Sequence, residues 1–323
     1  MSVSPLASAI AQVYLKQLEA KQASARAITA APETALLREK ILNSGLLPHQ
    51  RTFCEDQSTL QLAMVAGFGA GKSYGGACKT ILLALENQGY VGAYFEPTAP
   101  MLRDIALRTF EEVLEKLGIE WRFRASPLPE ITLLLPQAPT TILLRTFENY
   151  QRIRGQNLAF AIADEIDTCR AGIAQNATNM ILARLRSGNV QQFCLTSTPE
   201  GYGFLYNWFV EKPADDKRLI HARTTDNPHL PQGFINSLYA NYPSNLIASY
   251  INGEFTNLTQ HSVYPEFDRD LNASTLDLSN WSAFEYDHLH IGVDFNVGFC
   301  AWVVVLQRGR EFHAIKFGAA RDT

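Results

Sequence analysis

A glycine-rich segment that ends in Lys-Ser points most clearly to chemistry in this sequence. It follows the apolar run at residues 60–65 and comes directly before a helical pattern. Glycine and alanine leave such a loop free of bulky side chains, so its backbone N–H groups can converge on a phosphate at the positive end of the next helix. Its residues are Ala66, Gly67, Phe68, Gly69, Ala70, Gly71, Lys72 and Ser73.

This segment matches the P-loop pattern G-x-x-x-x-G-K-S/T except that Ala66 replaces the first glycine. Lys72 would bridge the β- and γ-phosphates of ATP, and the Ser73 hydroxyl would bind Mg²⁺. The alternative is a glycine-rich turn with an exposed lysine. The preceding strand pattern, the Lys-Ser pair and the following helical pattern all agree with a P-loop and disfavour that alternative.

Two adjacent carboxylates end the apolar run at residues 159–163. Asp164 would hold the Mg²⁺ shell through water, and Glu165 would be the general base that activates the attacking water. Adjacent carboxylates at a strand end are elsewhere often a solvated turn. The P-loop upstream favours the catalytic interpretation.

Further polar residues lie where a nucleotide site would need them. Ser197 and Thr198 follow the run at 192–195 and could sense the γ-phosphate and pass its loss to a moving segment, although an ordinary Ser/Thr turn is the alternative. Gln50 lies shortly before the P-loop strand and could read the adenine edge. A surface glutamine is nearly as good an interpretation.

Two arginines precede the acidic pair, at Arg152 and Arg154. A guanidinium at this end of the sheet could stabilise charge on the transferred phosphoryl group, in its own site or in that of a neighbouring subunit. Solvated or DNA-facing arginines are an equal alternative.

The elements that must position these residues follow an alternating pattern. Short apolar runs are separated by longer amphipathic stretches, which is typical of βαβ units around a mostly parallel sheet. The predicted strands are 60–65, 91–95, 160–163, 192–195 and 219–223, and the predicted helices are 73–85, 102–117, 173–185, 232–242 and 245–252. Residues 131–135 and 141–144 predict a hairpin inserted in this core, and residues 289–293, 301–306 and 312–316 predict three more strands.

Composition restricts the class of protein. The chain has 323 residues, 46% hydrophobic and 19% charged, which indicates a globular chain of more than one domain. A net charge of −4 argues against tight sequence-specific DNA binding but permits transient gripping through a few local contacts. The five widely spaced cysteines and the absence of any long apolar window predict a soluble intracellular protein with reduced thiols and no membrane span.

Together these motifs resemble the large subunit of tailed-phage terminases, in the order in which that family carries them. The match covers residues 46–300, and its most particular parts are the segment that begins at Ser197 and the runs 225–231 and 250–255. It consists of Gln50, the loop 66–73, Arg154 with Gly155, Asp164 with Glu165, Ser197-Thr198-Pro199-Glu200-Gly201 with Phe204 and Tyr206 after it, and the runs 225–231, 250–255 and 263–267.

The resemblance implies a P-loop NTPase core of the RecA-like (ASCE) class, a small lid subdomain and the first strands of an RNase H-like nuclease domain. The expected boundaries are an N-terminal helical segment at 1–45, the ATPase core at 46–210, the lid at 211–255, a linker at 256–287 and the incomplete nuclease domain at 288–323. Many relatives carry an arginine inside the P-loop. This chain has Phe68 near that place, which shifts the expected role of that arginine to Arg154.

Asp294 follows a strand pattern that resembles the start of the nuclease domain and would be its first metal ligand. A two-metal nuclease needs several carboxylates. The sequence supplies only this one before Thr323, so we expect no DNA cleavage by this chain.

The resemblance also implies a function and partners. We expect an ATPase with ATP and Mg²⁺ as cofactors that translocates double-stranded viral DNA into a procapsid. Its partners would be the portal protein, the small terminase subunit and further copies in a ring, although the isolated chain would be a monomer. It would act in the cytoplasm of the infected bacterial host and transiently on the procapsid. The alternatives are a helicase-like or other P-loop DNA-remodelling ATPase, and a non-catalytic prophage remnant.

Overall fold

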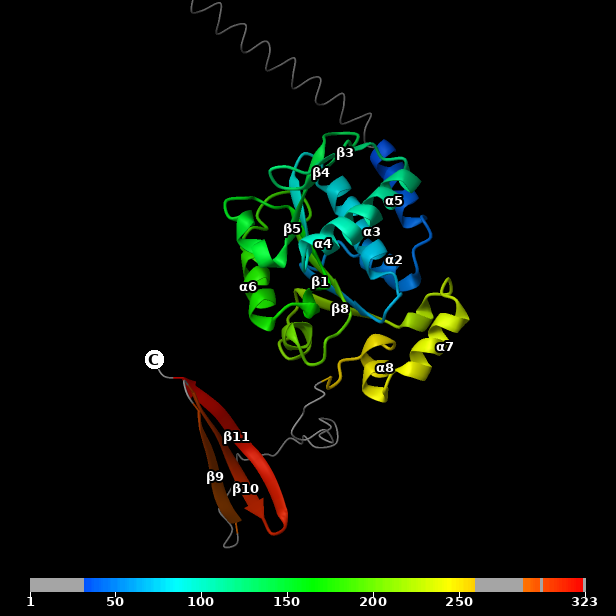
Figure 1. The fold of residues 1–323 in the computed structure, drawn as a ribbon. Helices are drawn as coiled ribbons and strands as arrows, with labels where there is room; N and C mark the ends of the chain where they lie inside the picture. Colours follow the sequence, from blue (N-terminus) through cyan, green and yellow to red (C-terminus); the bar gives the residue numbers. More distant parts are fainter. Residues whose placement is uncertain (1–31, 259–286, 297–298, 322–323) are drawn as a thin grey trace, which may run out of the picture. The chain divides into compact units, whose positions relative to one another are not determined.

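The computed structural model describes residues 32–258, 287–296 and 299–321 (Figure 1). The expected helical segment 1–45 and linker 256–287 lie largely outside these residues. The chain divides into two compact units, Met1–Gln260 and His261–Thr323, which are described separately. In the described part, no helix is long and apolar enough to cross a membrane.

The first unit is built on an eight-stranded sheet in the order β3-β4-β5-β2-β6-β7-β1-β8. All pairs from β5 to β8 are parallel, and β3 and β4 are antiparallel additions at one edge. The strands are β1 Gln61–Ala66, β2 Val91–Glu96, β3 Trp121–Arg124, β4 Glu130–Leu133, β5 Thr140–Thr146, β6 Phe160–Asp164, β7 Gln192–Ser197 and β8 Lys217–Ala222. The expected α/β fold with a mostly parallel sheet is confirmed.

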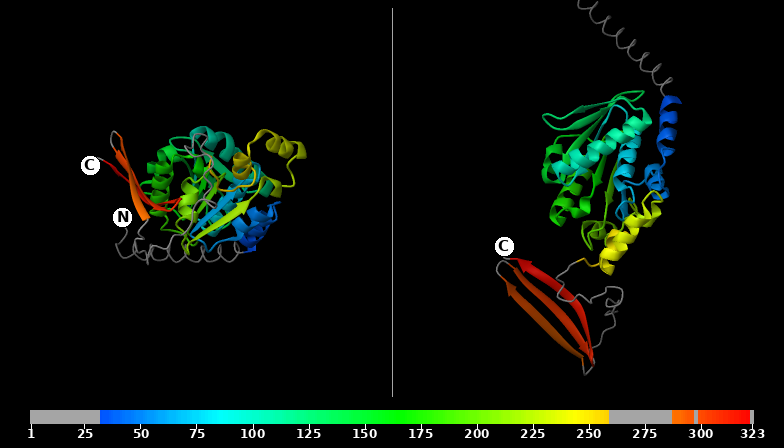
Figure 2. Two further views of the ribbon diagram at one scale, coloured as in Figure 1. Left: turned by 90° about the horizontal axis from the view of Figure 1, so that it is seen from below. Right: turned by 45° about the vertical axis from the view of Figure 1, so that its right-hand side comes forward.

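Helices cover both faces of this sheet (Figures 1 and 2). Residues 32–42 are helical, and the α-helices that follow are α2 Pro48–Glu55, α3 Lys72–Glu86, α4 Ala99–Met101, α5 Leu107–Leu117, α6 Ala171–Leu182, α7 Gln232–Asn241 and α8 Ser244–Tyr250. Short 3₁₀ or π segments are η1 Leu102–Ala106, η2 Phe147–Ile153, η3 Ile166–Thr168, η4 Tyr206–Val210 and η5 Thr224–Asp226. The helix predicted over 102–117 therefore begins as one π-helical turn.

The period of two along each strand divides the core into two layers. Met64 of β1 packs in a cluster with Ile81 of α3 and Phe110 of α5. The next residue, Val65, packs in the cluster on the other face with Ile181 of α6. Because both faces of the sheet are covered, β1, β6 and β7 are buried along their whole length, as parallel strands between helices must be.

Two strands have partners that the sequence pattern did not predict. β4 and β5 do form an antiparallel pair, but β5 also pairs in parallel with β2 and therefore lies inside the sheet. β8 pairs in parallel with β1 and forms the other edge of the sheet, although its residues fall in the segment 211–255 that was assigned to the lid. In both cases the strand partner is distant in sequence, so a local pattern does not reveal it.

The second unit contains a three-stranded antiparallel sheet in the order β11-β10-β9. Its strands are β9 Asp287–Asn296, β10 Phe299–Arg308 and β11 Glu311–Arg321. The three strands predicted from the sequence are therefore present. Asp294 lies near the end of β9, paired with Ala301 of β10.

Candidate active site

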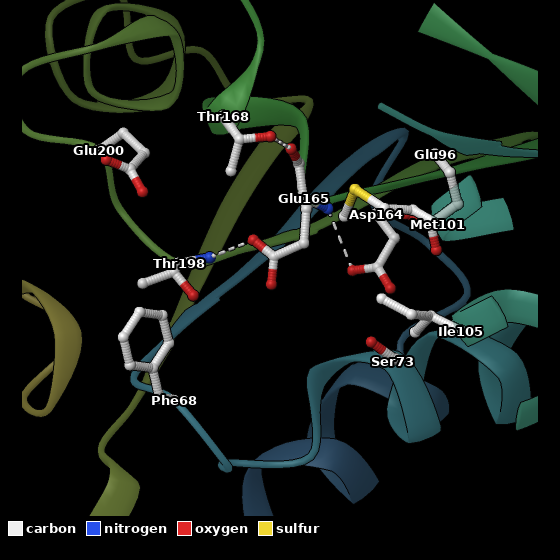
Figure 3. A pocket seen from close by; sticks show the side chains of 10 residues that line it. All are labelled: Phe68, Ser73, Glu96, Met101, Ile105, Asp164, Glu165, Thr168, Thr198 and Glu200. Atoms are coloured by element: carbon white, nitrogen blue, oxygen red, sulfur yellow. Dashed lines mark hydrogen bonds between the residues drawn. The ribbon is translucent and has the colours of Figure 1, made fainter. Parts of the chain in front are cut away.

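The predicted phosphate-binding and acidic residues meet at the carboxyl edge of the sheet. β7 pairs in parallel with both β1 and β6, so the loop after β1, the acidic pair that ends β6 and the hydroxyl residues that end β7 are neighbours. They surround a cavity of about 230 Å³ (Figure 3). The lining residues are Phe68, Ser73, Glu96, Met101, Ile105, Asp164, Glu165, Thr168, Thr198 and Glu200.

The loop between β1 and α3 depends on its glycines. Gly71 caps α3 in the left-handed region, with φ 81°. A Cβ atom on Gly67 would lie 2.4 Å from the carbonyl oxygen of Ile251 and 2.5 Å from Oγ1 of Thr224. The loop therefore has glycine at 67 because the segment 211–255, which we call the lid segment after its expected role, approaches its backbone closely.

Lys72 lies inside this loop and is only 7% exposed. Its Nζ donates hydrogen bonds to the carbonyl oxygens of Ala66 at 3.3 Å and Gly67 at 3.2 Å. It also forms an ion pair with Oε1 of Glu165 at 3.5 Å. The ammonium group thus lies between the loop and the expected general base.

Asp164 is fully buried and its carboxylate is held by two hydroxyl groups. Thr196 Oγ1 donates to Oδ1 at 2.6 Å, and the Tyr94 hydroxyl donates to Oδ2 at 3.0 Å. These bonds hold the carboxyl group in one orientation.

Glu165 has a left-handed backbone conformation, with φ 49° and ψ 38°, which is rare for a residue with a side chain. Its Oε2 accepts hydrogen bonds from the Thr198 amide at 3.0 Å and from Ser197 Oγ at 3.3 Å. Burial raises the pKa of Glu165, Lys72 opposes this change and Asp164 adds to it. A raised pKa brings a carboxylate closer to the basicity that proton abstraction from water requires.

The loop after β7 is tied to the end of β6 through Asp167, which sequence analysis did not single out. Its carboxylate accepts hydrogen bonds from the backbone amides of Glu200 and Leu205, both at 2.8 Å. Together with the bonds from Ser197 and Thr198 to Glu165, these contacts join the two expected coupling residues directly to the acidic motif.

Gln50 lies next to the P-loop but is 3% exposed, so it is not a surface glutamine. Its Nε2 donates to the carbonyl oxygen of Gly71 at 2.6 Å, and its Oε1 accepts from the Leu47 amide at 2.7 Å. The neighbouring His49 contacts the carbonyl oxygen of Ala70 at 2.8 Å through Nε2. The amide expected to read an adenine edge is therefore bonded to the P-loop itself.

The lid segment holds the P-loop from the other side. The Phe68 amide donates to the carbonyl oxygen of Tyr250 at 2.7 Å, and the two rings lie 4.7 Å apart. Asn227 Nδ2 donates to the carbonyl oxygen of Gly69 at 2.6 Å. The Tyr250 hydroxyl reaches Oε2 of Glu200, at 3.2 Å, in the loop after β7.

Arg152 and Arg154 lie at the end of η2, and both are exposed. Neither lines the cavity of Figure 3, so the P-loop and acidic residues meet without them. Arg152 instead lines a separate cavity with Arg145 and Asn149.

The cavity fits a hydrated cation and phosphates better than a bare metal ion. Among the described residues, no group of three or more His, Cys, Asp or Glu is placed to hold a metal by itself. Mg²⁺ usually keeps several water ligands and shares its shell with phosphates. Glu96 and Thr198 line this cavity, and within the described part of the chain both carboxyl oxygens of Glu96 and the hydroxyl of Thr198 are buried without a hydrogen-bond partner. A polar ligand would satisfy them.

Comparison with known proteins settles the family. Residues 63–270 match the family described as terminase large subunit, T4likevirus-type, N-terminal. The chain belongs to this family. Terminase large subunits are ATPases that package phage DNA, as the motifs led us to expect.

Solved structures agree with this terminase assignment at the level of the fold. The large terminase from a thermophilic bacteriophage, solved with ADP, is 15% identical with a TM-score of 0.55, and the match covers 88% of this chain and 68% of that one. The ATPase domain of the Thermus phage P74-26 large terminase is 16% identical with a TM-score of 0.53, covering 67% and 96%. The large terminase of bacteriophage HK97 is 15% identical with a TM-score of 0.51, covering 85% and 62%. No curated protein sequence matches the chain.

Proposed function

We propose that this terminase large subunit hydrolyses ATP at the cavity of Figure 3 and uses the energy to move double-stranded viral DNA into a procapsid. One observation carries the proposal: two separate segments meet at one cavity, which Ser73, Asp164 and Glu165 line and where Lys72 pairs with Glu165. A similar terminase was solved with ADP, and another structure of it with ATP-γ-S, which supports a nucleotide as the ligand.

The loop residues would bind the phosphates. The loop ends at the amino end of α3, which carries positive partial charge, and Lys72 would exchange its two carbonyl partners for phosphate oxygens. Ser73 would bind Mg²⁺ directly and Asp164 would bind it through water. When bound, this cation neutralises charge on the phosphates.

Glu165 would activate the attacking water. The water oxygen forms a bond to the γ-phosphorus, its proton passes to the Glu165 carboxylate, and the bond to the β-phosphate oxygen breaks to leave ADP. Thr198 N–H and Ser197 Oγ orient the carboxylate through its other oxygen, Oε2. The ion pair with Lys72 keeps that carboxylate ionised until the phosphates take up the lysine.

Movement would begin at the contacts between this site and its neighbours. Ser197 and Thr198 touch Glu165, and the lid segment touches the P-loop through Asn227 and Tyr250. A change at the γ-phosphate would therefore reach the lid in one or two contacts. Arg154, exposed and away from its own cavity, would stabilise the phosphoryl group in a neighbouring subunit of a ring.

The partners follow from the family. We infer that the motor contacts double-stranded DNA, the portal protein and the small terminase subunit, in the host cytoplasm and then on the procapsid. Asp294, on β9, would be one carboxylate of an RNase H-like nuclease site.

The proposal is tested by separating binding from hydrolysis. Lys72→Ala should lose ATP–Mg²⁺ binding because it removes a phosphate contact, whereas Glu165→Gln should keep binding and lose at least about a hundredfold of turnover, since only the base is lost. Binding is measured with a fluorescent ATP analogue and turnover by phosphate release. Glu112→Gln, on the exposed side of α5, serves as the control. Equal turnover in wild type and Glu165→Gln would refute the assignment of the base.

A further inference from the structure

We propose that Glu96, at the end of β2, is a further acidic residue of the hydrolytic site, where its carboxylate accepts hydrogen bonds from the water shell of the nucleotide-bound divalent cation. This inference rests on the proposed ATPase function and adds a residue to it. It makes Glu96 a positioning residue for the hydrated cation.

The sheet places Glu96 beside the acidic motif. β2 and β6 are parallel neighbours with Phe95 opposite Ala163, so Glu96 and Asp164 follow at the same level on adjacent strands. Tyr94 lies two residues before Glu96, hence on the same face, and its hydroxyl donates to Asp164. Figure 3 shows the Glu96 side chain on the side of the cavity where Asp164 and Ser73 lie.

Burial makes an unligated Glu96 costly. The residue is 1% exposed, and within the described part of the chain neither carboxyl oxygen has a hydrogen-bond partner. A buried polar group without a hydrogen-bond partner destabilises the folded state. Because Glu96 also lines a cavity, we expect a ligand there to donate hydrogen bonds to its carboxyl oxygens.

The chemistry of the neighbours indicates which donors. Both oxygens of Asp164 already accept hydrogen bonds, from Thr196 and Tyr94, whereas Glu96 has its full acceptor capacity left. A phosphate would bring only acceptors and further negative charge, so it offers no partner to the carboxylate form of Glu96. Water molecules polarised by a divalent cation bring donors and positive charge together. A hydrated divalent cation is therefore the ligand that fits Glu96.

The test separates cation positioning from phosphate binding. The affinity of wild type and Glu96→Gln for a fluorescent ATP analogue is measured at increasing Mg²⁺ and in excess EDTA. In parallel, Mn²⁺ bound with the nucleotide is followed by electron paramagnetic resonance. Loss of an outer-shell partner typically weakens metal binding about 10- to 100-fold. We expect a shift of that size in the Mg²⁺ and Mn²⁺ dependence, with unchanged affinity in EDTA.

The control variant is Glu112→Gln, which should bind the nucleotide as wild type does, both with the cation and in EDTA. An unchanged cation dependence in Glu96→Gln would overturn the proposal, and so would an equal loss of affinity with and without the cation, which would mean a purely structural role. If Glu96→Gln does not fold by circular dichroism, Glu96→Asp takes its place. It keeps the charge but shortens its reach, so the same cation shift is expected and its absence would equally overturn the proposal.

Failure of the proposed function would look different. If Lys72→Ala bound the ATP analogue as wild type does, the cavity would not be the nucleotide site, and both proposals would fall. If Lys72→Ala lost binding and Glu96→Gln kept the wild-type cation dependence, only the role of Glu96 would be refuted.

Discussion

At the scale of single residues, the site is held by internal contacts that a nucleotide must replace. Lys72 donates to two carbonyl oxygens of its own loop and pairs with Glu165. These bonds satisfy a buried ammonium that would otherwise be costly. Phosphate binding therefore exchanges one set of oxygen partners for another, and the same exchange releases Glu165 to accept a proton.

Glu96 predicts a pH dependence of stability. Burial, then Asp164 and Glu165, raise its pKa to about 10 from an ordinary value of 4.5. Without a bound cation, the folded chain thus keeps a proton that the unfolded chain releases, so this group makes the free energy of unfolding fall as the pH rises above about 4.5. Glu96→Gln removes that contribution.

We expect Glu96→Gln to become more stable relative to wild type as the pH rises from 4.5 to 8, by roughly a few kcal/mol at pH 8. The measurement is urea unfolding of both proteins across this range, with Glu112→Gln as the control whose difference from wild type stays constant. A difference that is flat with pH would show that Glu96 ionises normally in the folded protein.

The sequence predicted a site residue only where a short stretch of chain carries the pattern for it. Lys72, Ser73, Asp164 and Glu165 lie in short patterns, and the structure brings them together. Glu96 had only the weak signal of an acid after an apolar run. That it faces the cavity depends on pairing with β6, which lies far along the chain. The internal bonds of Gln50 could not be read from its neighbours in sequence either.

At the scale of elements, the P-loop lies between two supports. α2 holds the loop through Gln50 and His49, and the lid segment holds it through Asn227 and the backbone of Tyr250. The loop conformation is thus shared with elements on both sides. We therefore expect a displacement of the lid segment to change the conformation of the loop, and a change in the loop to displace the lid segment.

Asn227→Ala tests this link. It removes the hydrogen bond to Gly69, a contribution of about 0.5–1.5 kcal/mol, so amide hydrogen exchange at Phe68 and across residues 224–230 should become up to about tenfold faster. Exchange is measured by mass spectrometry without nucleotide. The exposed neighbour His229, replaced by alanine, should leave exchange of the loop as in wild type. Unchanged protection in Asn227→Ala would mean that the lid does not stabilise the loop.

The order of the strands in the sheet could not be predicted from the sequence, and the reason is physical. The runs that became β1, β2, β6 and β7 were predicted as strands of a parallel sheet, because continuous apolar runs are typical of strands covered on both faces. Nothing local distinguishes an inner strand from an inserted hairpin, or an edge strand from the start of a lid. β5 and β8 received their places from partners more than forty residues away.

At the scale of the whole molecule, the proposed role of the exposed Arg154 requires a site completed by a second copy. Arg154→Ala should leave the ATP affinity of the isolated chain nearly unchanged, because the side chain does not line its own cavity. In the motor assembled on procapsids, it should lower hydrolysis about 10³-fold or more, the usual contribution of an arginine acting on the transferred phosphoryl group.

Mixing gives the control for this prediction. Assembled rings that combine Arg154→Ala with Glu165→Gln subunits should recover part of the phosphate release, because some interfaces then pair an intact base with an intact arginine. Rings of either variant alone should recover none. Normal hydrolysis by the assembled Arg154→Ala motor would mean that Arg154 is a solvated surface residue with no role in hydrolysis.

At Glu165 the left-handed backbone conformation lowers the stability of the fold, whereas the proposed hydrolysis needs the carboxylate at this position. A residue with a side chain at φ 49° carries a conformational cost, of order 1 kcal/mol, that glycine would not. In a gene that is no longer selected for DNA packaging, replacement of this glutamate by glycine would therefore increase the stability of the fold. Such replacements would be tolerated and would accumulate. Persistence of glutamate here is then a mark of selection for hydrolysis, which a survey of working and decayed prophages could read directly from their sequences.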